Sequence, residues 1–262
     1  LDMDPGIDDA VALCLALSEP SLEVVAVTAT GGAVSPDQAT LNVQAIVEQL
    51  DPERWPRLGS APPDQMLRID GPHLFGSDGL CGAHFPVAQR HHRHSSVKVI
   101  CDEVRTAPGE ITIIATGPLT NIAAALQQQP DLAALIGHLI ILGGTIGGPG
   151  NVTAAAEFNM YCNADAAQSV FRSAITNLDL LEKIPNDNSR RGTLLRTLLP
   201  NAFRAYRQLL GMEGIHLHDA VAVVAAARPE LFTSEPMFGD VETDGTLTYG
   251  ATVLDRRRHS KN

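Results

Sequence analysis

Short apolar runs rich in β-branched residues alternate along the chain with segments of helical periodicity. Such runs are typical of buried strands, and three of them end directly before a glycine: residues 23–30, 111–116 and 139–142. Apolar residues at helical spacing predict helices over residues 10–17, 36–50, 95–107, 120–126, 164–173, 194–210 and 220–227. The alternation predicts an α/β fold: a mostly parallel open sheet flanked by helices on both faces, with ligands bound at the carboxyl ends of the strands.

The remaining segments have shorter or weaker patterns. Leu1 has the pattern of a strand end, Pro5-Gly6 that of a turn, and Asp8-Asp9 that of an acidic first helical turn. Residues 66–94 have little periodicity and predict a long loop of the kind that forms lids or binds ligands. Short strands are predicted at 58–59 and 175–178, and the alternating tail 237–254 predicts a small antiparallel hairpin that turns at Asp244-Gly245.

Size and charge narrow the class of protein. The chain has 262 residues, of which 44% are hydrophobic, and this is enough for one core, so one domain over residues 1–262 is expected. The net charge of −11 argues against nucleic acid or an anionic membrane surface as a partner. The basic run Arg256-Arg257-Arg258 is interpreted as a solvated tail. No apolar run reaches membrane-spanning length, so no membrane partner is expected.

The cysteines bear on the compartment. Cys14, Cys81, Cys101 and Cys162 are far apart and follow no metal-site spacing, which favours reduced thiols and a cytoplasmic location. No signal peptide is visible. The chain nevertheless begins without Met inside an expected strand, so residues before Leu1 are taken to be missing and a removed targeting segment stays an open alternative.

Four carboxylates crowd the first turn of the chain, at positions 2, 4, 8 and 9. Carboxylates near a helix N-terminus gain from the helix dipole, yet four held together repel one another. The loop is therefore expected to bind a hard metal ion through oxygen or to shift a pKa. Asp4 and Asp9 are the natural first pair of ligands, since they flank the turn. The alternative is a solvated acidic turn that caps the helix.

A further carboxylate must come from elsewhere in the chain, because a calcium-sized cation takes six to eight oxygen ligands. Asp219 is the best distant candidate, since it directly precedes the apolar helix 220–227 and follows His216-Leu217-His218. Read alone, Asp219 is equally a helix N-cap.

The stretch Asp2-x-Asp4-Pro5-Gly6-x-Asp8-Asp9 resembles the signature of the inosine-uridine preferring nucleoside N-ribohydrolase family, whose members hold calcium there and cleave N-ribosidic bonds. Three further stretches match that family in order along nearly the whole chain: residues 115–121 (Ala-Thr-Gly-Pro-Leu-Thr-Asn), residues 150–159 (Gly-Asn through Ala-Glu-Phe-Asn) and His218-Asp219-Ala220. The resemblance implies a nucleoside hydrolase-like fold, a homo-oligomer, a ribonucleoside substrate and a Ca²⁺ ion. It implies these protein ligands for the ion: Asp4, Asp9, the Thr116 carbonyl and Asp219.

The resemblance also implies roles in catalysis and substrate binding. Asp4 would accept the proton of the attacking water, and His218 is the candidate that protonates the leaving base. Asp2 would orient the loop from behind. The substrate-binding residues implied are Asp8, Asn151, Glu157 and Asn159, which would hold ribose hydroxyls, Leu142, which would line the pocket, and His218. Asparagine and carboxylate groups suit such hydroxyls, while a polar surface loop is the alternative for residues 150–159 and simple packing the alternative for Leu142.

Two departures from the family pattern bear on base preference. Gly31-Gly32-Ala33 stands where family members commonly have Gly-Asn, and Phe75 stands where many have the His of a His-Gly-x-x-Gly-Leu stretch. Phe75 cannot transfer a proton, although an aromatic ring can stack on a base. A non-catalytic nucleoside or ribose binder is therefore one alternative.

A haloacid-dehalogenase-like phosphatase is a second alternative, because Asp2-x-Asp4 after a strand also resembles that family's nucleophile and acid. Such a phosphatase needs a later Lys and an acidic loop, which Lys183 and Asp187 do not form.

Overall fold

The computed structural model describes residues 1–262 apart from 66, 69–73, 89–93, 174–189, 213 and 256–262. The strand predicted at 175–178 and the basic tail Arg256-Arg257-Arg258 lie outside the described residues.

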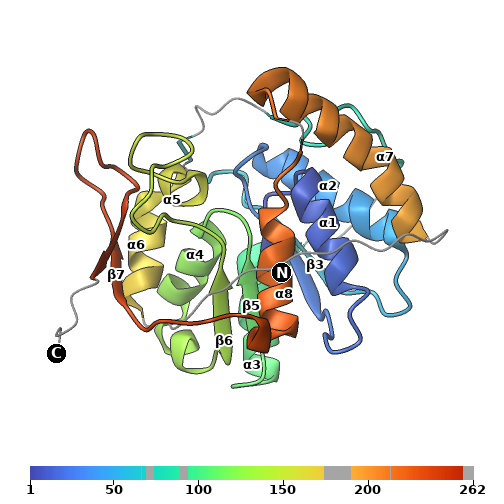
Figure 1. Ribbon diagram of the computed structural model, residues 1–262. Coiled ribbons are helices and arrows are strands. Elements are labelled where there is room, and N and C mark those ends of the chain that lie inside the picture. Colours follow the sequence, from blue (N-terminus) through green and yellow to red (C-terminus); the bar gives the residue numbers. More distant parts are fainter. Residues whose placement is uncertain (66, 69–73, 89–93, 174–189, 213, 256–262) are drawn as a thin grey trace.

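Six parallel strands form the central sheet, in the order β4-β3-β2-β1-β5-β6 (Figure 1). Their bounds are β1 Asp2–Met3, β2 Ala26–Ala29, β3 Arg57–Ser60, β4 His94–Ser95, β5 Thr112–Ala115 and β6 His138–Ile141. A separate antiparallel pair, β7 (Phe238–Val241) and β8 (Thr252–Asp255), lies beside α6 (Ala164–Arg172) at one edge of the molecule. The predicted parallel sheet and C-terminal hairpin are both confirmed.

Helices cover both faces of the sheet, as predicted. Ile113 and Ile114 are consecutive on β5, and the side chains of consecutive strand residues point to opposite faces. Ile113 packs in a core cluster with the helices on one face, and Ile114 packs in a second cluster with the helices on the other. The first face carries α3 (Ser96–Thr106), α4 (Thr120–Gln128) and α6, and the second carries α1 (Ile7–Ala16), α2 (Pro36–Leu50) and α8 (His218–Ala227).

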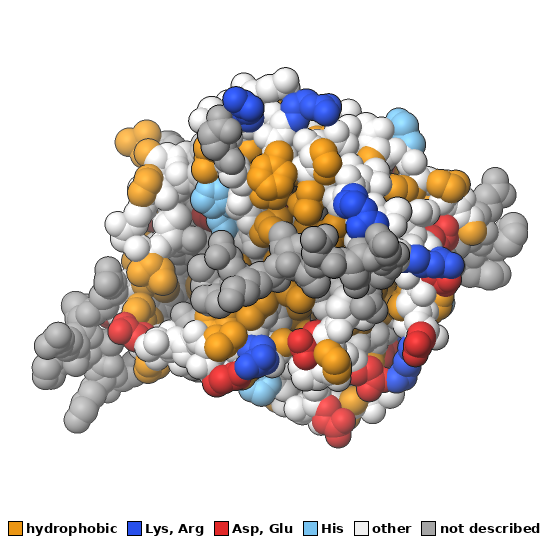
Figure 2. All heavy atoms as spheres, turned by 45° about the vertical axis from the view of Figure 1, so that its right-hand side comes forward, with side chains coloured by type: hydrophobic (Ala, Val, Ile, Leu, Met, Phe, Trp, Pro, Cys, Tyr) orange, Lys and Arg blue, Asp and Glu red, His pale blue; other side chains and the backbone are white. Residues whose placement is uncertain are grey.

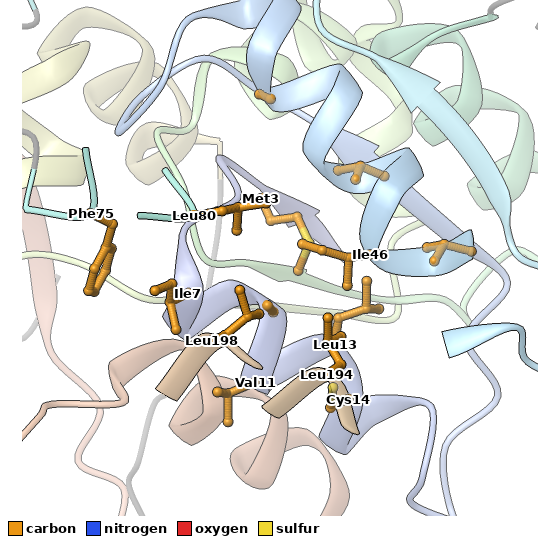
Figure 3. Packing of buried hydrophobic residues seen from close by; sticks show 14 of the residues in the cluster. Met3, Ile7, Val11, Leu13, Cys14, Ile46, Phe75, Leu80, Leu194 and Leu198 are labelled. Atoms are coloured by element: carbon orange, nitrogen blue, oxygen red, sulfur yellow. The ribbon is translucent and has the colours of Figure 1, made fainter. Parts of the chain in front are cut away.

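Helix α7 (Arg190–Ala205) packs outside α1 and α2. Leu194 and Leu198 of α7 contact the core that Met3, Ile7 and Ile46 build around α1 (Figure 3). A π-helical turn, Tyr206–Leu210, continues α7. Phe203 of α7 and Leu209 and Leu210 of this turn are exposed, and Figure 2 shows hydrophobic side chains gathered at the surface on this side of the molecule. Of the helices in the described part of the chain, none is both long and apolar enough to cross a membrane.

Several helix starts follow from local side-chain chemistry. The Ser35 hydroxyl accepts a hydrogen bond from the Gln38 amide at 3.3 Å, directly before Pro36 opens α2. Ser95 caps α3 in the same way through the Lys98 amide. Both are N-cap contacts that satisfy amides with no partner inside the helix, so the helix start predicted at Ser35-Pro36 is confirmed.

A short strand and a short α-helix were not predicted. Strand β4 has only two residues, His94 and Ser95, and pairing with β3 rather than an apolar pattern defines it. Helix α5 (Phe158–Cys162) begins within residues 150–159, for which a polar surface loop was the alternative, and it has too few residues for a helical period to be visible. Helix α7 also begins four residues before the predicted start at Leu194. The earlier start was missed because residues 190–193 carry no apolar pattern.

The sheet order places a ligand site at one point. From β1 the chain winds outward through β2 and β3 to β4, then returns to the other side of β1 to form β5 and β6. In open α/β sheets, ligands bind at the carboxyl ends of the strands where the winding direction reverses. This switch point lies between β1 and β5, which end at Met3 and Ala115.

Candidate active site

The predicted site residues converge on the switch point. Asp4 directly follows β1, Thr116 follows β5 and Leu142 follows β6. Helices α1 and α8 pack side by side (Figure 1), and their first turns carry Asp8 and Asp9 on α1 and Asp219 on α8.

Asp8, Asp9 and Asp219 form an acidic cluster whose carboxylate oxygens lie within 4.8 Å of one another. Asp9 and Asp219 are buried, and Asp8 is partly buried. The carboxyl groups of Asp8 and Asp219 lie close together, and the charge of Asp8 adds to burial in raising the pKa of Asp219. The acid at the start of α8 therefore lies against the first turn of α1, and the group of three contains Asp8 where Asp4 was expected from the sequence.

Asp4 is held beside this cluster in a narrow cradle. Its Oδ2 accepts a hydrogen bond of 2.6 Å from the Ala33 amide. A Cβ atom on Gly32 would lie 2.1 Å from Asp4 Oδ2, and one on Gly117 would lie 2.6 Å from Oδ1. Glycine at both positions is therefore what lets the backbone approach the carboxylate so closely. The departure at Gly31-Gly32-Ala33 is part of this cradle.

Hydrogen bonds tie the two strand ends to the acidic loop. Asp9 Oδ2 accepts from the Gly6 amide at 2.9 Å, and Asp9 Oδ1 accepts from the Thr116 hydroxyl at 2.7 Å. The Thr116 carbonyl accepts a hydrogen bond of 2.7 Å from Asn159 Nδ2. Because a carbonyl oxygen has two lone pairs, the Thr116 oxygen keeps one for a further ligand.

Asp2 lies behind the cluster. Its Oδ1 accepts from the Thr28 hydroxyl at 2.6 Å and from Asn121 Nδ2 at 2.8 Å, while its Oδ2 is buried and has no hydrogen-bond partner among the residues that the structure describes. Burial raises the pKa of Asp2 to about 6, and the two hydrogen bonds oppose that rise. Asp2 therefore ties the end of β1 to β2 and to the start of α4.

Two asparagines that sequence reasoning missed support the acidic loop from buried positions. Asn121 Nδ2 also donates to the Ala29 carbonyl at 2.8 Å. Asn42 Nδ2 donates to the carbonyls of Pro5, at 3.0 Å, and Asp78, at 2.7 Å. No local sequence signal marks either asparagine, because their burial and their distant partners exist only in the folded chain.

The electrostatics of the cluster call for positive charge. Burial first, and then the charge of Asp9, raise the pKa of Asp4 well above its ordinary value, and burial with neighbouring carboxylates does the same for Asp219. Burial and the charge of Asp8 raise the pKa of Asp9 to about 7. Within the described part of the chain, no Lys or Arg forms an ion pair with any of these carboxylates.

A hard divalent cation fits this donor set. The available atoms are carboxylate oxygens and one main-chain carbonyl, which are the ligands such ions take. Buried charges are otherwise costly unless they are paired. A divalent cation would neutralise these buried carboxylates, which have no Lys or Arg partner among the described residues.

The predicted sugar-binding residues lie around α5 at the same rim. Glu157 caps this helix: its carboxylate accepts from the amides of Asn159 and Met160 at 3.1 and 3.3 Å, and from Gly144 at 3.0 Å. Asn159 is buried and donates to the carbonyls of Thr116 and Leu142, which leaves its Oδ1 as an acceptor. Asn151 is exposed and accepts from the Phe158 amide at 2.8 Å.

Leu142 is partly buried and packs against the core cluster that includes Ala222 and Val223 of α8. Packing accounts for this side chain, and its position after β6 also puts it at the rim of the site.

His218 is exposed and directly precedes Asp219 at the start of α8. The ring of His216 lies next to it, with centroids 5.0 Å apart and the two planes tilted by 39°. Desolvation, followed by the charge of His216, lowers the pKa of His218.

The side chain of Phe75 is buried in the core and is not exposed to a ligand. Its ring is 8% exposed, belongs to the core cluster around α1 and lies 6.1 Å from the Tyr206 ring. A Cβ on Gly6 would lie 3.2 Å from its Cδ2 atom. The interpretation that Phe75 could stack on a base is therefore corrected: its ring packs against the acidic turn.

Comparison with known proteins gives a consistent result. A family model described as inosine-uridine preferring nucleoside hydrolase matches residues 1–262. Two curated relatives, the non-specific ribonucleoside hydrolases RihC of Shigella boydii and Escherichia coli, are each 37% identical over 273 aligned residues, covering 97% of this chain and 87% of the relative.

Solved structures agree with these relatives. A plant nucleoside hydrolase, PpNRh1, superposes with a TM-score of 0.85 at 31% identity, over 97% of this chain and 85% of that one. A purine-preferring ribonucleoside hydrolase from Gardnerella vaginalis has a TM-score of 0.84 at 29% identity, over 97% and 87%.

Proposed function

Because the chain belongs to the inosine-uridine preferring nucleoside hydrolase family, and so is a nucleoside N-ribohydrolase, we propose that it hydrolyses the N-glycosidic bond of ribonucleosides with Ca²⁺ held at the acidic cluster. The observation that carries the proposal is the position of Asp219, which comes from the far end of the chain yet lies within 4.8 Å of Asp8 and Asp9. The phosphatase alternative is excluded, because the family match spans the whole chain.

The protein ligands proposed for the ion are Asp4, Asp9, the carbonyl of Thr116 and Asp219. Asp8 is close enough to contribute as well. When bound, the ion supplies an anchor for sugar hydroxyls and lowers the pKa of a bound water.

Asp4 is the proposed base that takes the proton of the attacking water. A general base works best when its pKa lies near the working pH, and burial raises the pKa of Asp4 in that direction. The Ala33 amide and the two flanking glycines hold the carboxylate in one orientation. A fixed base does not need to be ordered during the reaction.

The sugar is proposed to lie between α1 and α5. Asp8, Asn151, Glu157 and Asn159 would accept or donate hydrogen bonds to ribose hydroxyls, with Leu142 at the pocket wall. The transition state of such a reaction has oxocarbenium character. The surrounding carboxylates favour positive charge on the sugar, which lowers the barrier.

Departure of the base requires a proton. As the C1′–N bond breaks, its electron pair stays on the base nitrogen, and His218 is proposed to donate a proton there. Water adds to C1′ and gives its proton to Asp4, so the products are ribose and the free base. A general acid contributes about 10²–10⁴-fold.

Ribose release from inosine and uridine, measured with Ca²⁺ and with excess chelator, tests the proposal. Full activity in chelator would refute the role of the ion. Binding of a nucleoside without any ribose release would instead favour the non-catalytic binder. D219N is expected to lose Ca²⁺ binding by calorimetry, whereas D240N, which alters an exposed acid paired with Arg172, is the matched control.

Two broader expectations belong with this proposal. A homo-oligomer is proposed, and light scattering on the purified protein tests it. A cytoplasmic location is also proposed, and the four free cysteines agree with a reducing compartment. Fractionation of cells that express the full-length protein tests the location.

A further inference from the structure

Four aromatic rings from three separate segments form a series of neighbouring pairs that ends at His218, the residue directly before Asp219. Phe75 comes from the long loop after β3, and Tyr206 comes from the π-helical turn after α7. His216 and His218 come from the segment that opens α8. The ring centroids are separated by 6.1 Å from Phe75 to Tyr206, 6.1 Å from Tyr206 to His216, and 5.0 Å from His216 to His218.

The first two rings of this series are buried in the core, and the last two are exposed to solvent. Phe75 and Tyr206 are 8% and 6% exposed and belong to the core cluster around α1. Tyr206 also hydrogen-bonds to the backbone of His216. His216 and His218 are both exposed. His216 therefore lies between a rigid wall and the outermost ring.

The imidazole of His218 has little else to hold it. Among the described residues, no hydrogen bond to its ring is found, and its ring contact is with His216. An exposed side chain without such contacts exchanges between rotamers on a fast timescale. The stacked arrangement of Tyr206 and His216, with 23° between their planes, gives the His218 ring a fixed surface to pack on.

We propose that His216 is a positioning residue of this hydrolase: its ring, stacked on Tyr206, holds the imidazole of His218 in place at the side of the site where the base leaves. The inference rests on the proposed role of His218 as the proton donor. It assigns to His216 a packing role, so an aromatic ring, and not a titrating group, is what position 216 requires.

The expected signature is a loss confined to substrates whose leaving group needs a proton. Misplacing a reacting group by about 1 Å can cost up to about 100-fold in rate. For H216A, kcat with inosine should fall about tenfold, and KM should change by less than about twofold. Hydrolysis of 4-nitrophenyl β-D-ribofuranoside should be unchanged within about twofold, because 4-nitrophenolate leaves without protonation. H216F restores a ring and should keep at least about half of the wild-type kcat with inosine.

Two controls separate this role from general damage. H138A replaces an exposed histidine at the amino end of β6, whereas the site lies at the carboxyl ends of the strands. This variant should behave as wild type on both substrates. Thermal melting should place H216A and H216F within a few degrees of wild type, since the replaced side chain is exposed.

The remaining outcomes are each decisive. H216A with wild-type kcat on inosine, while H218A is impaired, overturns the inference and leaves the proposed function standing. Equal losses on both substrates, or equal losses in H216A and H216F, overturn it too, because ring packing against His218 predicts neither. If the wild type releases no ribose, or H218A is unimpaired on inosine, then the proposed function itself or the role of His218 fails first.

Discussion

At the scale of single residues, the site depends on how closely backbone approaches the Asp4 carboxylate. One oxygen receives the Ala33 amide, and both oxygens lie against glycines where no side chain fits. The carboxylate therefore has one available orientation. Such pre-organisation is what a base needs to take a proton from a water held in a fixed place.

Gly32→Ala tests this cradle. The new Cβ would lie 2.1 Å from Asp4 Oδ2, a distance that forces the carboxylate or the turn to move. We expect kcat for inosine to fall by about 100-fold, in line with the effect of a 1 Å misplacement. The matched control is Gly148→Ala, where a Cβ would meet nothing within 4 Å. Wild-type kcat in Gly32→Ala would show that the orientation of Asp4 does not matter.

At the scale of elements, the helices that carry chemistry begin at the site. Helices α1 and α8 present their first turns to the acidic cluster, and α5 begins with the Glu157 carboxylate. Glu157 satisfies amides of α5 and also the amide of Gly144 after β6. This one side chain therefore joins the loop after β6 to the helix that carries Asn159.

Glu157→Ala is expected to act on both stability and binding. Three partly buried amides lose their acceptor, which lowers the free energy of unfolding by about 1–3 kcal/mol. The KM for inosine should rise by at least about tenfold. The helix that carries Asn159 loses its N-cap, and the ribose hydroxyls lose the carboxylate proposed to bind them. Urea unfolding and steady-state kinetics measure the two effects. Glu157→Gln keeps part of the cap and should be intermediate, whereas Glu110→Ala, at an exposed position, should resemble wild type.

Elements with a strong local pattern could be predicted from the sequence, and those defined by partners could not. The strands at 111–116 and 139–142 and the capped helix at 36–50 were predicted because apolar runs and the Ser35-Pro36 cap are local signals. Strand β4 exists because it pairs with β3, and α5 exists because Glu157 caps it.

The same distinction applies to the site. Asp4, Asp9 and Asp219 could be selected from acidic crowding and family resemblance, and the structure brings the acids of α1 and α8 together. Asn42 and Asn121 were missed because their role lies in contacts with distant backbone, which no local pattern shows. Phe75 was interpreted wrongly for a related reason: only the packed structure shows that its ring is enclosed.

At the scale of the whole molecule, the sheet order decides which acids meet. The chain reverses its winding between β1 and β5, so the loop after β1 and the strand end at Thr116 become neighbours. The packing of α8 against α1 then adds Asp219. The fold thereby concentrates negative charge in a buried place, and in the absence of a cation this charge opposes folding.

The dependence of stability on pH and Ca²⁺ should report this charge. The folded-state pKa of Asp9 is about 7 against an unfolded value of 3.8, and the pKa values of Asp4 and Asp219 are raised as well. A raised carboxyl pKa contributes stability that is fully present below the unfolded value and is lost as the pH rises through the folded value. In chelator, these groups should therefore destabilise the protein progressively between about pH 4 and pH 7. Ca²⁺ binds the ionised carboxylates and displaces protons, so its stabilising effect should grow over the same window.

The measurement is the difference in Tm between Ca²⁺-loaded and chelated protein at a series of pH values from 5 to 8. Taking the difference cancels groups elsewhere whose titration the ion does not affect. The shift should be small at pH 5 and largest at pH 8, and D219N should show a much smaller shift at every pH. A Tm difference that is constant across this range, or that shrinks as the pH rises, would mean that the buried acids are not the groups that bind the ion.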